Sequence, residues 1–330
     1  MTAPPGSPPP AGRGPTPAAE LRQTPRRRRH DPTPIPHSVV PPAPSSVDLH
    51  THTRRSDGVL DPAALVRAAV ACGVTTLSLT DHDTLSGYRE VVAAGAVPAG
   101  MTLLPGIEIN ALVTRDVGLW EGELHILGFG MDPDDAAFEA VLVDQRAQRR
   151  IRFERTVDRL RELGLGIDTQ VAVLAHDGND ALGRPTIARA LIGAGHAESV
   201  EDAFRRLLGH GCPAYVPRLG LGPVEAIAAI RAAGGLAALA HFLEAPERED
   251  VLRELVDAGL GGLEVYYRTF DQAAVDAVGT VARTLGLIAT GGTDYHGDTG
   301  TYAESHARIW VPPAAAADLL ARIGLPSGAG

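Results

Sequence analysis

The run Asp48-Leu49-His50-Thr51-His52 holds two histidines separated by one residue. On an extended chain, residues two apart project to the same face, so His50 and His52 present their imidazoles side by side. Neutral imidazole is a common ligand for transition-metal ions such as Zn²⁺. The pair therefore predicts one edge of a metal site.

Further side chains able to bind a metal ion stand at or near the ends of apolar runs. They are Asp57, His82, Glu108, His125, His241, Asp294 and His296. Together with the first pair they include six of the twelve histidines of the chain. One histidine at a strand end is more often a hydrogen-bonding residue than a ligand, but the whole set favours a centre that holds several cations.

Short apolar runs that alternate with amphipathic helices position these side chains. The predicted strands are residues 47–49, 76–80, 103–107, 124–127, 236–240, 263–266 and 287–290. The first helix is marked by Asp61 as N-cap, Pro62 as first helical residue and Gly73 just past the end. This repetition is typical of a parallel α/β sheet. Because the carboxyl ends of barrel strands share one mouth, the candidate ligands should meet there.

The alternation of strands and helices stops between Gly130 and Val216, where the apolar periodicity becomes helical. Seven arginines gather early in this segment: Arg146, Arg149, Arg150, Arg152, Arg155, Arg159 and Arg161. Acidic residues interleave with them, so most of these arginines are expected on a solvated helix face. We predict a helical insertion, residues 131–216, between the fourth and fifth strands of a domain that spans residues 47–330.

Residues 1–46 have the composition of a disordered tail rich in proline and arginine. They contain 14 of the 26 prolines and no Phe, Trp or Tyr, so they cannot bury enough apolar surface to offset chain entropy. No stretch of the chain approaches the roughly 20 apolar residues of a membrane span, and the two cysteines cannot build a disulfide framework. We expect a cytoplasmic protein without a membrane partner.

Composition and charge exclude several functions. The chain has no lysine, which removes Schiff-base chemistry and the lysine-containing phosphate-binding loop. The formal net charge is −10, and the first 46 residues hold six arginines against Glu20 and Asp31, so the rest of the chain carries −14. Duplex DNA is not an expected partner, because non-specific binding to it needs clustered positive charge. Any attraction for phosphate must be local.

Six short motifs together resemble the PHP (polymerase and histidinol phosphatase) domain family. They are Asp48-Leu49-His50-Thr51-His52, Ser56-Asp57-Gly58, Thr80-Asp81-His82-Asp83, Gly106-Ile107-Glu108, Leu239-Ala240-His241 and Gly292-Thr293-Asp294-Tyr295-His296. The resemblance extends over residues 47 to about 312. It implies a distorted (β/α)7 barrel and a hydrolase that uses two or three divalent metal ions.

The resemblance also implies how the ligands divide among the ions. One ion takes His50, His52, Glu108 and Asp294; a second shares Glu108 and adds His125 and His241; a third takes Asp57, His82 and His296. Such nitrogen and oxygen ligands suit Zn²⁺, Mn²⁺ or iron. Asp57 stands where many members carry histidine, and this harder ligand makes the third site tolerant of Mn²⁺ or Mg²⁺. Two bridged ions would activate a shared water for attack on phosphorus.

Three residues are candidates for roles beyond metal binding. Asp81 either passes a proton to the leaving group, orients a histidine, or holds its own loop. The segment Gly183-Arg184-Pro185-Thr186-Ile187-Ala188-Arg189 is similar to one in the PHP subgroup that acts on 3',5'-nucleoside bisphosphates and short 5'-phosphorylated RNA. Arg184 is predicted to grip a second phosphate of the substrate, with Arg149 assisting.

The sequence therefore predicts a metal-dependent phosphatase of small nucleotides, first of all 3',5'-nucleoside bisphosphates, whose action extends to 5'-3' exonuclease cleavage of short RNA. Thr186 and Cys212 stand where that subgroup commonly has histidine and lysine. Two alternatives stay open. One is a histidinol phosphatase, whose substrate has a single phosphate and an amine, and the other is a noncatalytic metal-stabilised module.

Overall fold

The structure is a computed structural model that describes Met1 and residues 44–113, 123–174, 182–298 and 300–325. The tail predicted for residues 1–46 lies outside the described residues, apart from Met1 and residues 44–46. Ser45 is buried and its hydroxyl donates a hydrogen bond to the Val311 carbonyl, while the boundary between tail and domain stays a prediction. In the part of the chain that the structure describes, no helix is long and apolar enough to cross a membrane.

Seven strands form one sheet whose spatial order follows the chain. They are β1 Val47–Asp48, β2 Thr76–Leu79, β3 Thr102–Leu112, β4 Glu123–Phe129, β5 Leu236–Leu239, β6 Gly262–Tyr267 and β7 Ile288–Gly292. The Leu49 N–H donates to the Gly291 carbonyl at 3.1 Å, and the Asp294 N–H donates to the His50 carbonyl at 2.7 Å. These bonds bring the last strand beside the first. The sheet is therefore a nearly closed seven-stranded barrel, as predicted.

The fourth strand runs against its neighbours, which corrects the prediction of a parallel sheet. β4 is antiparallel to both β3 and β5, whereas the other neighbouring strands are parallel. Only residues 113–122 separate β3 from β4, and a parallel crossover needs a dozen residues or more. β3 also continues to Leu112, so Glu108 lies inside this strand and not at its end. The reversal places His125 opposite Asn110, at the same end of the barrel as Glu108.

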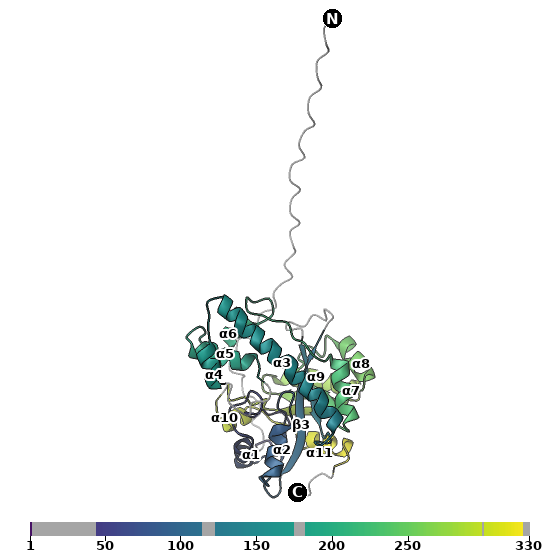
Figure 1. The fold of residues 1–330 in the computed structure, drawn as a ribbon. Helices are drawn as coiled ribbons and strands as arrows, with labels where there is room; N and C mark the ends of the chain where they lie inside the picture. Colours follow the sequence, from purple (N-terminus) through teal and green to yellow (C-terminus); the bar gives the residue numbers. More distant parts are fainter. Residues whose placement is uncertain (2–43, 114–122, 175–181, 299, 326–330) are drawn as a thin grey trace. The chain divides into compact units, whose positions relative to one another are not determined.

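Helices cover the strands and fill the long link between β4 and β5 (Figure 1). They are α1 Pro62–Ala71, α2 Ser86–Ala93, α3 Ala136–Glu162, α4 Asp168–Leu174, α5 Arg184–Gly193, α6 Val200–Ala203, the π-helix η1 Phe204–Leu208, α7 Pro223–Ala232, α8 Glu249–Asp257, α9 Gln272–Thr284, α10 Tyr302–His306 and α11 Pro313–Arg322. As expected, α1 starts at Pro62 after the N-cap Asp61, and Gly73 follows its end with φ 86°.

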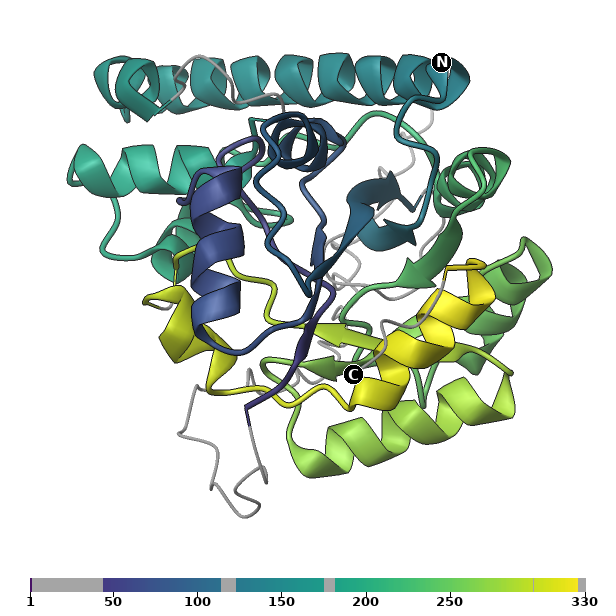
Figure 2. The same cartoon turned by 90° about the horizontal axis from the view of Figure 1, so that it is seen from below.

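The link between β4 and β5 begins with the 27-residue helix α3, which runs along one side of the barrel (Figure 2). α3 packs against α5 and α7. The helices of this link share an apolar cluster of their own, which includes Phe153, Leu160, Ile187 and Leu191. The treatment of residues 131–216 as a separate insertion stays a prediction.

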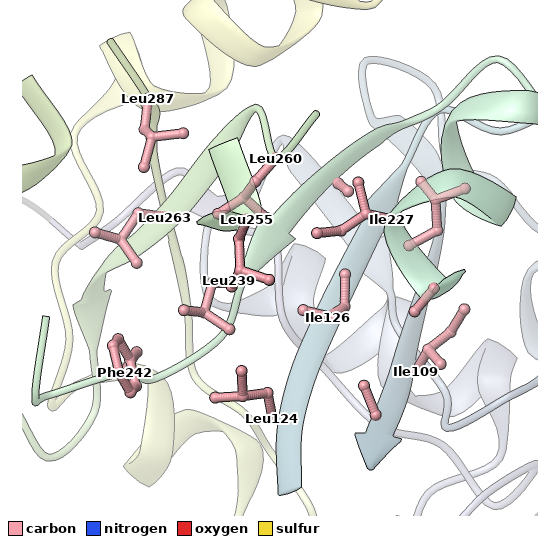
Figure 3. Packing of buried hydrophobic residues seen from close by; sticks show 14 of the residues in the cluster. Ile109, Leu124, Ile126, Ile227, Leu239, Phe242, Leu255, Leu260, Leu263 and Leu287 are labelled. Atoms are coloured by element: carbon pink, nitrogen blue, oxygen red, sulfur yellow. The ribbon is translucent and has the colours of Figure 1, made fainter. Parts of the chain in front are cut away.

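The largest apolar cluster lies between the strands and the helices that follow them (Figure 3). Leu124 and Ile126 of β4, Leu239 of β5 and Leu263 of β6 belong to it, and Leu255 reaches it from α8. Each of these side chains is at most 5% exposed. Dense packing of this kind resists small displacements, so the strand ends are held in fixed relative positions.

Candidate metal centre

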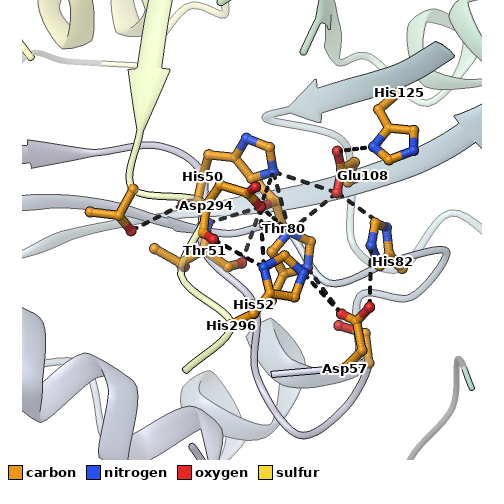
Figure 4. A network of polar contacts seen from close by, with 12 residues as sticks. His50, Thr51, His52, Asp57, Thr80, His82, Glu108, His125, Asp294 and His296 are labelled. Carbon is orange, nitrogen blue, oxygen red and sulfur yellow. Dashed lines mark hydrogen bonds and ion pairs between the residues drawn. The ribbon is translucent and has the colours of Figure 1, made fainter. Parts of the chain in front are cut away.

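Four side chains, from β3 and from the segments that follow β1 and β7, meet inside the barrel end; we call them the first group. They are His50, His52, Glu108 and Asp294. The Nε2 atom of His50 lies 3.4 Å from Glu108 Oε2 and 3.2 Å from Asp294 Oδ1, and His52 Nε2 lies 3.2 and 3.3 Å from the same oxygens. All four residues are buried. Their side chains point toward one another (Figure 4). The structure thus brings together the residues predicted for one ion.

A second group consists of Glu108, His125 and His241. Glu108 Oε1 lies 2.9 Å from His125 Nδ1 and 3.4 Å from His241 Nε2, and these two nitrogens are 3.1 Å apart. One oxygen of Glu108 therefore faces the second group while the other faces the first. This is the arrangement of a carboxylate that can bridge two cations.

The third group contains the predicted Asp57, His82 and His296, and the structure adds His52. Asp57 Oδ1 lies 3.2 Å from His296 Nε2, and Asp57 Oδ2 lies 3.6 Å from His82 Nε2. His52 Nδ1 is 3.8 Å from Asp57 Oδ1, although Nε2 of the same ring belongs to the first group. His52 thus stands between two groups, which spacing along the chain did not predict.

Several buried polar atoms of these groups have no hydrogen-bond partner among the described residues. They are His52 Nδ1, both carboxylate oxygens of Asp57, and His82 Nδ1. Buried polar atoms normally have a partner, because leaving them without one costs free energy. Imidazole nitrogens and carboxylate oxygens facing one another are a donor set for a divalent cation. The three clusters are therefore suited to metal binding.

Electrostatics favours the ionised carboxylates. Burial alone would raise the pKa of Glu108, but the neighbouring His125 and His82 hold it well below its usual value. The pKa of Asp57 is likewise held well below its usual value by His82 and His296 against the effect of burial. Burial lowers the pKa of His82 to about 3, whereas Asp294 and Glu108 raise the pKa of His52 to about 10 against the effect of burial. Charged carboxylate and neutral imidazole are the forms that can ligate a cation, so His52 would give up a proton to an ion that binds there.

Glu264 in β6 contacts the first and second groups, and the sequence reasoning missed it. Its side chain is fully buried, with Oε1 3.0 Å from His50 Nδ1 and Oε2 accepting the backbone N–H of His241 at 2.8 Å. An acceptor at Nδ1 fixes the proton there and turns Nε2 toward the first group. A single carboxylate inside the apolar run Leu263–Val265 was the signal that could have revealed it.

Two residues of the groups also adopt an uncommon backbone conformation. His241 has φ 31° and Asp294 has φ 47°, in the left-handed region that non-glycine residues rarely occupy. Glu264 holds the His241 backbone, and the Tyr267 hydroxyl donates to Asp294 Oδ2 at 2.8 Å. Such conformations persist where surrounding contacts impose them, as they do at functional sites.

Asp81, the predicted proton donor, points to a loop. Its Oδ1 accepts the Thr53 backbone N–H and the Ser56 hydroxyl, and its Oδ2 accepts the Thr53 hydroxyl, each at 2.7 Å. These bonds hold the loop that carries Asp57. The structure therefore places Asp81 as a support of that loop, and its action as a proton donor stays a prediction.

Beside the third group lies a cavity of about 140 Å³ that we call the arginine pocket. Its lining includes Arg149, Arg152, Arg184 and Arg218, together with Asp57, His82 and His125 on the side of the metal groups. Arg149 and Arg184 were predicted to bind substrate, and both line this pocket. Arg152 and Arg218 were not predicted.

Two carboxylates balance the four guanidinium groups of the pocket. Asp83 Oδ2 accepts from Arg149 Nε at 2.9 Å and from Arg218 Nη2 at 3.1 Å. Glu123 Oε1 lies 2.7 Å from Arg152 Nη1 and 3.2 Å from Arg184 Nη2. Burial lowers the pKa of Arg218 only to about 10, so it stays charged near neutral pH. These arginines outnumber their carboxylate partners, which suits an anion.

Comparison with known proteins agrees with this geometry. Residues 48–164 match the PHP domain. The 3',5'-nucleoside bisphosphate phosphatase of Chromobacterium violaceum is 31% identical over 260 residues, which cover 76% of this chain and 87% of that protein. The 5'-3' exoribonuclease Rnm of Salmonella typhimurium is 32% identical over 277 residues, which cover 80% and 89%.

A solved structure shows the same fold. It comes from Bifidobacterium adolescentis, is classified as a metal-dependent phosphoesterase, and superposes with a TM-score of 0.72 at 32% identity. The match covers 83% of this chain and 95% of that one. The barrel, the clusters of potential ligands and these similarities lead to one conclusion: the chain belongs to the PHP domain family and is a metal-dependent phosphoesterase.

Proposed function

We propose that this phosphoesterase releases phosphate from 3',5'-nucleoside bisphosphates. The observation that carries the proposal is the arginine pocket next to the third group, since a bisphosphate needs two anion sites that are one nucleoside apart. The phosphate to be hydrolysed would lie at the metal groups and the other phosphate among the arginines. The named activity of the Chromobacterium violaceum relative supports this assignment.

We assign the three groups to divalent ions, with Glu108 shared between the first and second. Zn²⁺, Mn²⁺ or iron suits the imidazole-rich first and second groups, and the carboxylate of Asp57 makes Mn²⁺ or Mg²⁺ suitable for the third. Bound ions of this kind lower the pKa of water and neutralise phosphate oxygens. The protein sets the spacing between the ions, since Glu108 belongs to both the first and the second group. Glu264 orients His50.

Arg184 and Arg149 are assigned to the second phosphate. Both have partners in the protein, Glu123 and Asp83, and each guanidinium is planar with several donors, so it can turn donors toward phosphate oxygens while it keeps its carboxylate. Histidinol phosphate offers only one phosphate, and its cationic amine would be repelled by the arginine pocket. Histidinol phosphatase activity is therefore the weaker candidate.

The same two sites would serve short 5'-phosphorylated RNA. In a 3',5'-bisphosphate and at the 5' end of such an RNA, a 5'-phosphate and a 3'-linked phosphate flank one nucleoside. Water attack on the 3'-linked phosphorus forms a new P–O bond and breaks the bond to the 3'-oxygen, which takes up a proton. The products would be a 5'-nucleotide and either phosphate or the shortened RNA, which is 5'-3' exonuclease action.

A phosphate-release panel with added Mn²⁺ tests the proposal. The substrates are adenosine 3',5'-bisphosphate, AMP, histidinol phosphate and a 5'-phosphorylated oligoribonucleotide, each given to the full chain. We expect the bisphosphate to be turned over with the highest kcat/KM and AMP to accumulate. Faster release from histidinol phosphate would favour that alternative. No release from any substrate, with Mn²⁺ only raising the melting temperature, would favour the noncatalytic module.

A further inference from the structure

Asn110 in β3 stands between the arginine pocket and the second group. Its Oδ1 accepts a hydrogen bond from Arg149 Nη2, and its Nδ2 lies 2.6 Å from His125 Nε2. On the other side of the same ring, His125 Nδ1 lies 2.9 Å from Glu108 Oε1. Asn110 is buried, and it lines the arginine pocket together with Arg149 and His125. A chain of hydrogen bonds thus joins a pocket arginine to the bridging carboxylate.

The donor and acceptor in each of these hydrogen bonds follow from counting the available protons. A guanidinium can only donate, so the Asn110 atom that faces Arg149 has to be the carbonyl oxygen. The amide NH₂ then faces His125 Nε2, which must accept. In the neutral form of the ring the single proton is then on Nδ1 and is donated to Glu108 Oε1.

This direction conflicts with ion binding by His125. Nδ1 is the nitrogen that faces His241 Nε2 and Glu108 in the second group, and a ligating nitrogen must offer its lone pair. The imidazole proton then moves to Nε2, which becomes a donor and needs an acceptor. Asn110 supplies one only if its amide turns over. The turned amide would place its NH₂ against Arg149 Nη2, so that two donors face each other.

We infer that Asn110 is a positioning residue that couples the second group to the arginine pocket. An ion on His125 turns the Asn110 amide and releases Arg149 Nη2, while the Nε bond to Asp83 keeps the guanidinium in the pocket. The released donor is available to a phosphate oxygen. A phosphate that engages Nη2 turns the amide in the same direction and favours the ion.

Binding of the ion and of the second phosphate is therefore cooperative, because coupling between two sites is reciprocal. The pocket acquires its full set of donors only when the second group holds its ion. A nucleotide would then be gripped mainly by a centre that is able to hydrolyse it. This inference rests on the proposed function, since it needs an ion at the second group and an anion in the pocket.

The test is a Zn²⁺ titration of the full chain against a chromophoric chelator, with and without saturating sulfate. Sulfate is a tetrahedral dianion that is not hydrolysed. The ion of the second group is identified as the one whose binding is lost in His241→Ala. For the unmodified chain, we expect sulfate to tighten the binding of this ion about tenfold.

Two variants separate coupling through Asn110 from direct contact between sulfate and the ion. Asn110→Asp accepts from both neighbours at once, and Asn110→Leu accepts from neither, so both should lower the sulfate effect to about twofold or less. Only the first of them adds a charge, which controls for electrostatics. An undiminished sulfate effect in both variants would overturn the inference and leave the proposed function intact. Failure of His241→Ala to lose an ion would overturn both.

A second readout follows the proton directly. In ¹⁵N NMR spectra of histidine-labelled protein, the ring of His125 should carry its proton on Nδ1 without Zn²⁺ and on Nε2 with saturating Zn²⁺. A His125→Gln sample assigns the resonances. A ring that keeps the same protonated nitrogen in both conditions would contradict the inference. This readout tests whether the ion binds His125 through Nδ1, on which the inference depends, while the two Asn110 variants test the coupling itself.

Discussion

The metal groups and the arginine pocket lie next to each other but attract ions of opposite charge. The groups combine imidazoles with three buried carboxylates, Asp57, Glu108 and Asp294, and so attract cations. The pocket combines four arginines with Asp83 and Glu123 and so attracts anions. A phosphate ester with a second phosphate matches this pair of neighbouring sites.

The two regions also come from different parts of the fold. Apart from Asp57 in the loop after β1, the residues of the groups lie on or just after barrel strands, which backbone hydrogen bonds and apolar packing hold in register. Arg149, Arg152 and Arg184 come from α3 and α5 in the long link between β4 and β5. We expect changes in the barrel residues to affect hydrolysis of every substrate, and changes in the pocket to affect only substrates with a second phosphate.

Loss of Glu108 should have the largest effect. Glu108→Ala removes the carboxylate shared by two groups, so kcat/KM should fall at least ~1000-fold for the bisphosphate and for 3'-AMP alike. The metal content of the purified protein should fall with it. Steady-state kinetics and elemental analysis check both outcomes. Retention of full activity would mean that the assignment of the groups is wrong.

Glu264→Gln tests the metal groups indirectly, because Glu264 acts through His50. The amide keeps the size of the side chain but loses the charge that orients His50, so metal affinity should fall about 10- to 100-fold. Excess Mn²⁺ should restore much of the turnover, which distinguishes weakened ion binding from a lost catalytic group. Unchanged ion affinity in a chelator titration would show that Glu264 has no such role.

Arg184→Ala tests the arginine pocket. Because one guanidinium contact to the second phosphate is lost, kcat/KM for adenosine 3',5'-bisphosphate should fall at least ~10-fold while that for 3'-AMP changes little. The matched control is Arg161→Ala, an exposed arginine of α3 that pairs with Asp158 and Asp168. Equal losses of kcat/KM on both substrates would show that the pocket does not act specifically on the second phosphate.

The smallest expected effect concerns the stability of the pocket at low pH. Burial would raise the pKa of Glu123, but Arg184 and Arg152 hold it below its usual 4.5. The resulting stability is fully present above the unfolded-state value near 4.5 and is lost as pH falls through the lower folded-state value.

Glu123→Gln should therefore melt below the unmodified chain at pH 6, and the gap should narrow as pH falls below 4.5. Thermal unfolding followed by circular dichroism measures this gap, with the exposed Glu162→Gln as control. A gap that stays constant with pH would show that the charge of Glu123 contributes nothing.

Much of the candidate centre could be predicted because its residues occur in short motifs. His50 and His52 are two residues apart on an extended chain, and the remaining ligands follow or lie in strands that apolar runs reveal. Gathering at one end of a barrel then follows from topology. The double position of His52 could not be predicted, since it depends on which ring nitrogen faces which group.

The direction of β4 and the identity of the buried arginines could not be predicted, for physical reasons. The direction of β4 depends on the short link from β3, and the apolar pattern of a strand is the same in either direction. Arg152 lies three residues from the predicted Arg149 on one face of α3, but other arginines surround it in the sequence and most of them resemble a solvated helix surface. Only the packing of α3 against α5 and α7 shows which arginines are buried.

The central claim is that the three groups hold divalent ions, and a crystal structure of the full chain grown with Mn²⁺ tests it most directly. Anomalous scattering at the manganese edge locates each ion without reference to the protein. The account predicts peaks within coordination distance of each group, with Glu108 bound to two of them. Manganese absent from these groups, or bound only elsewhere on the surface, would contradict it.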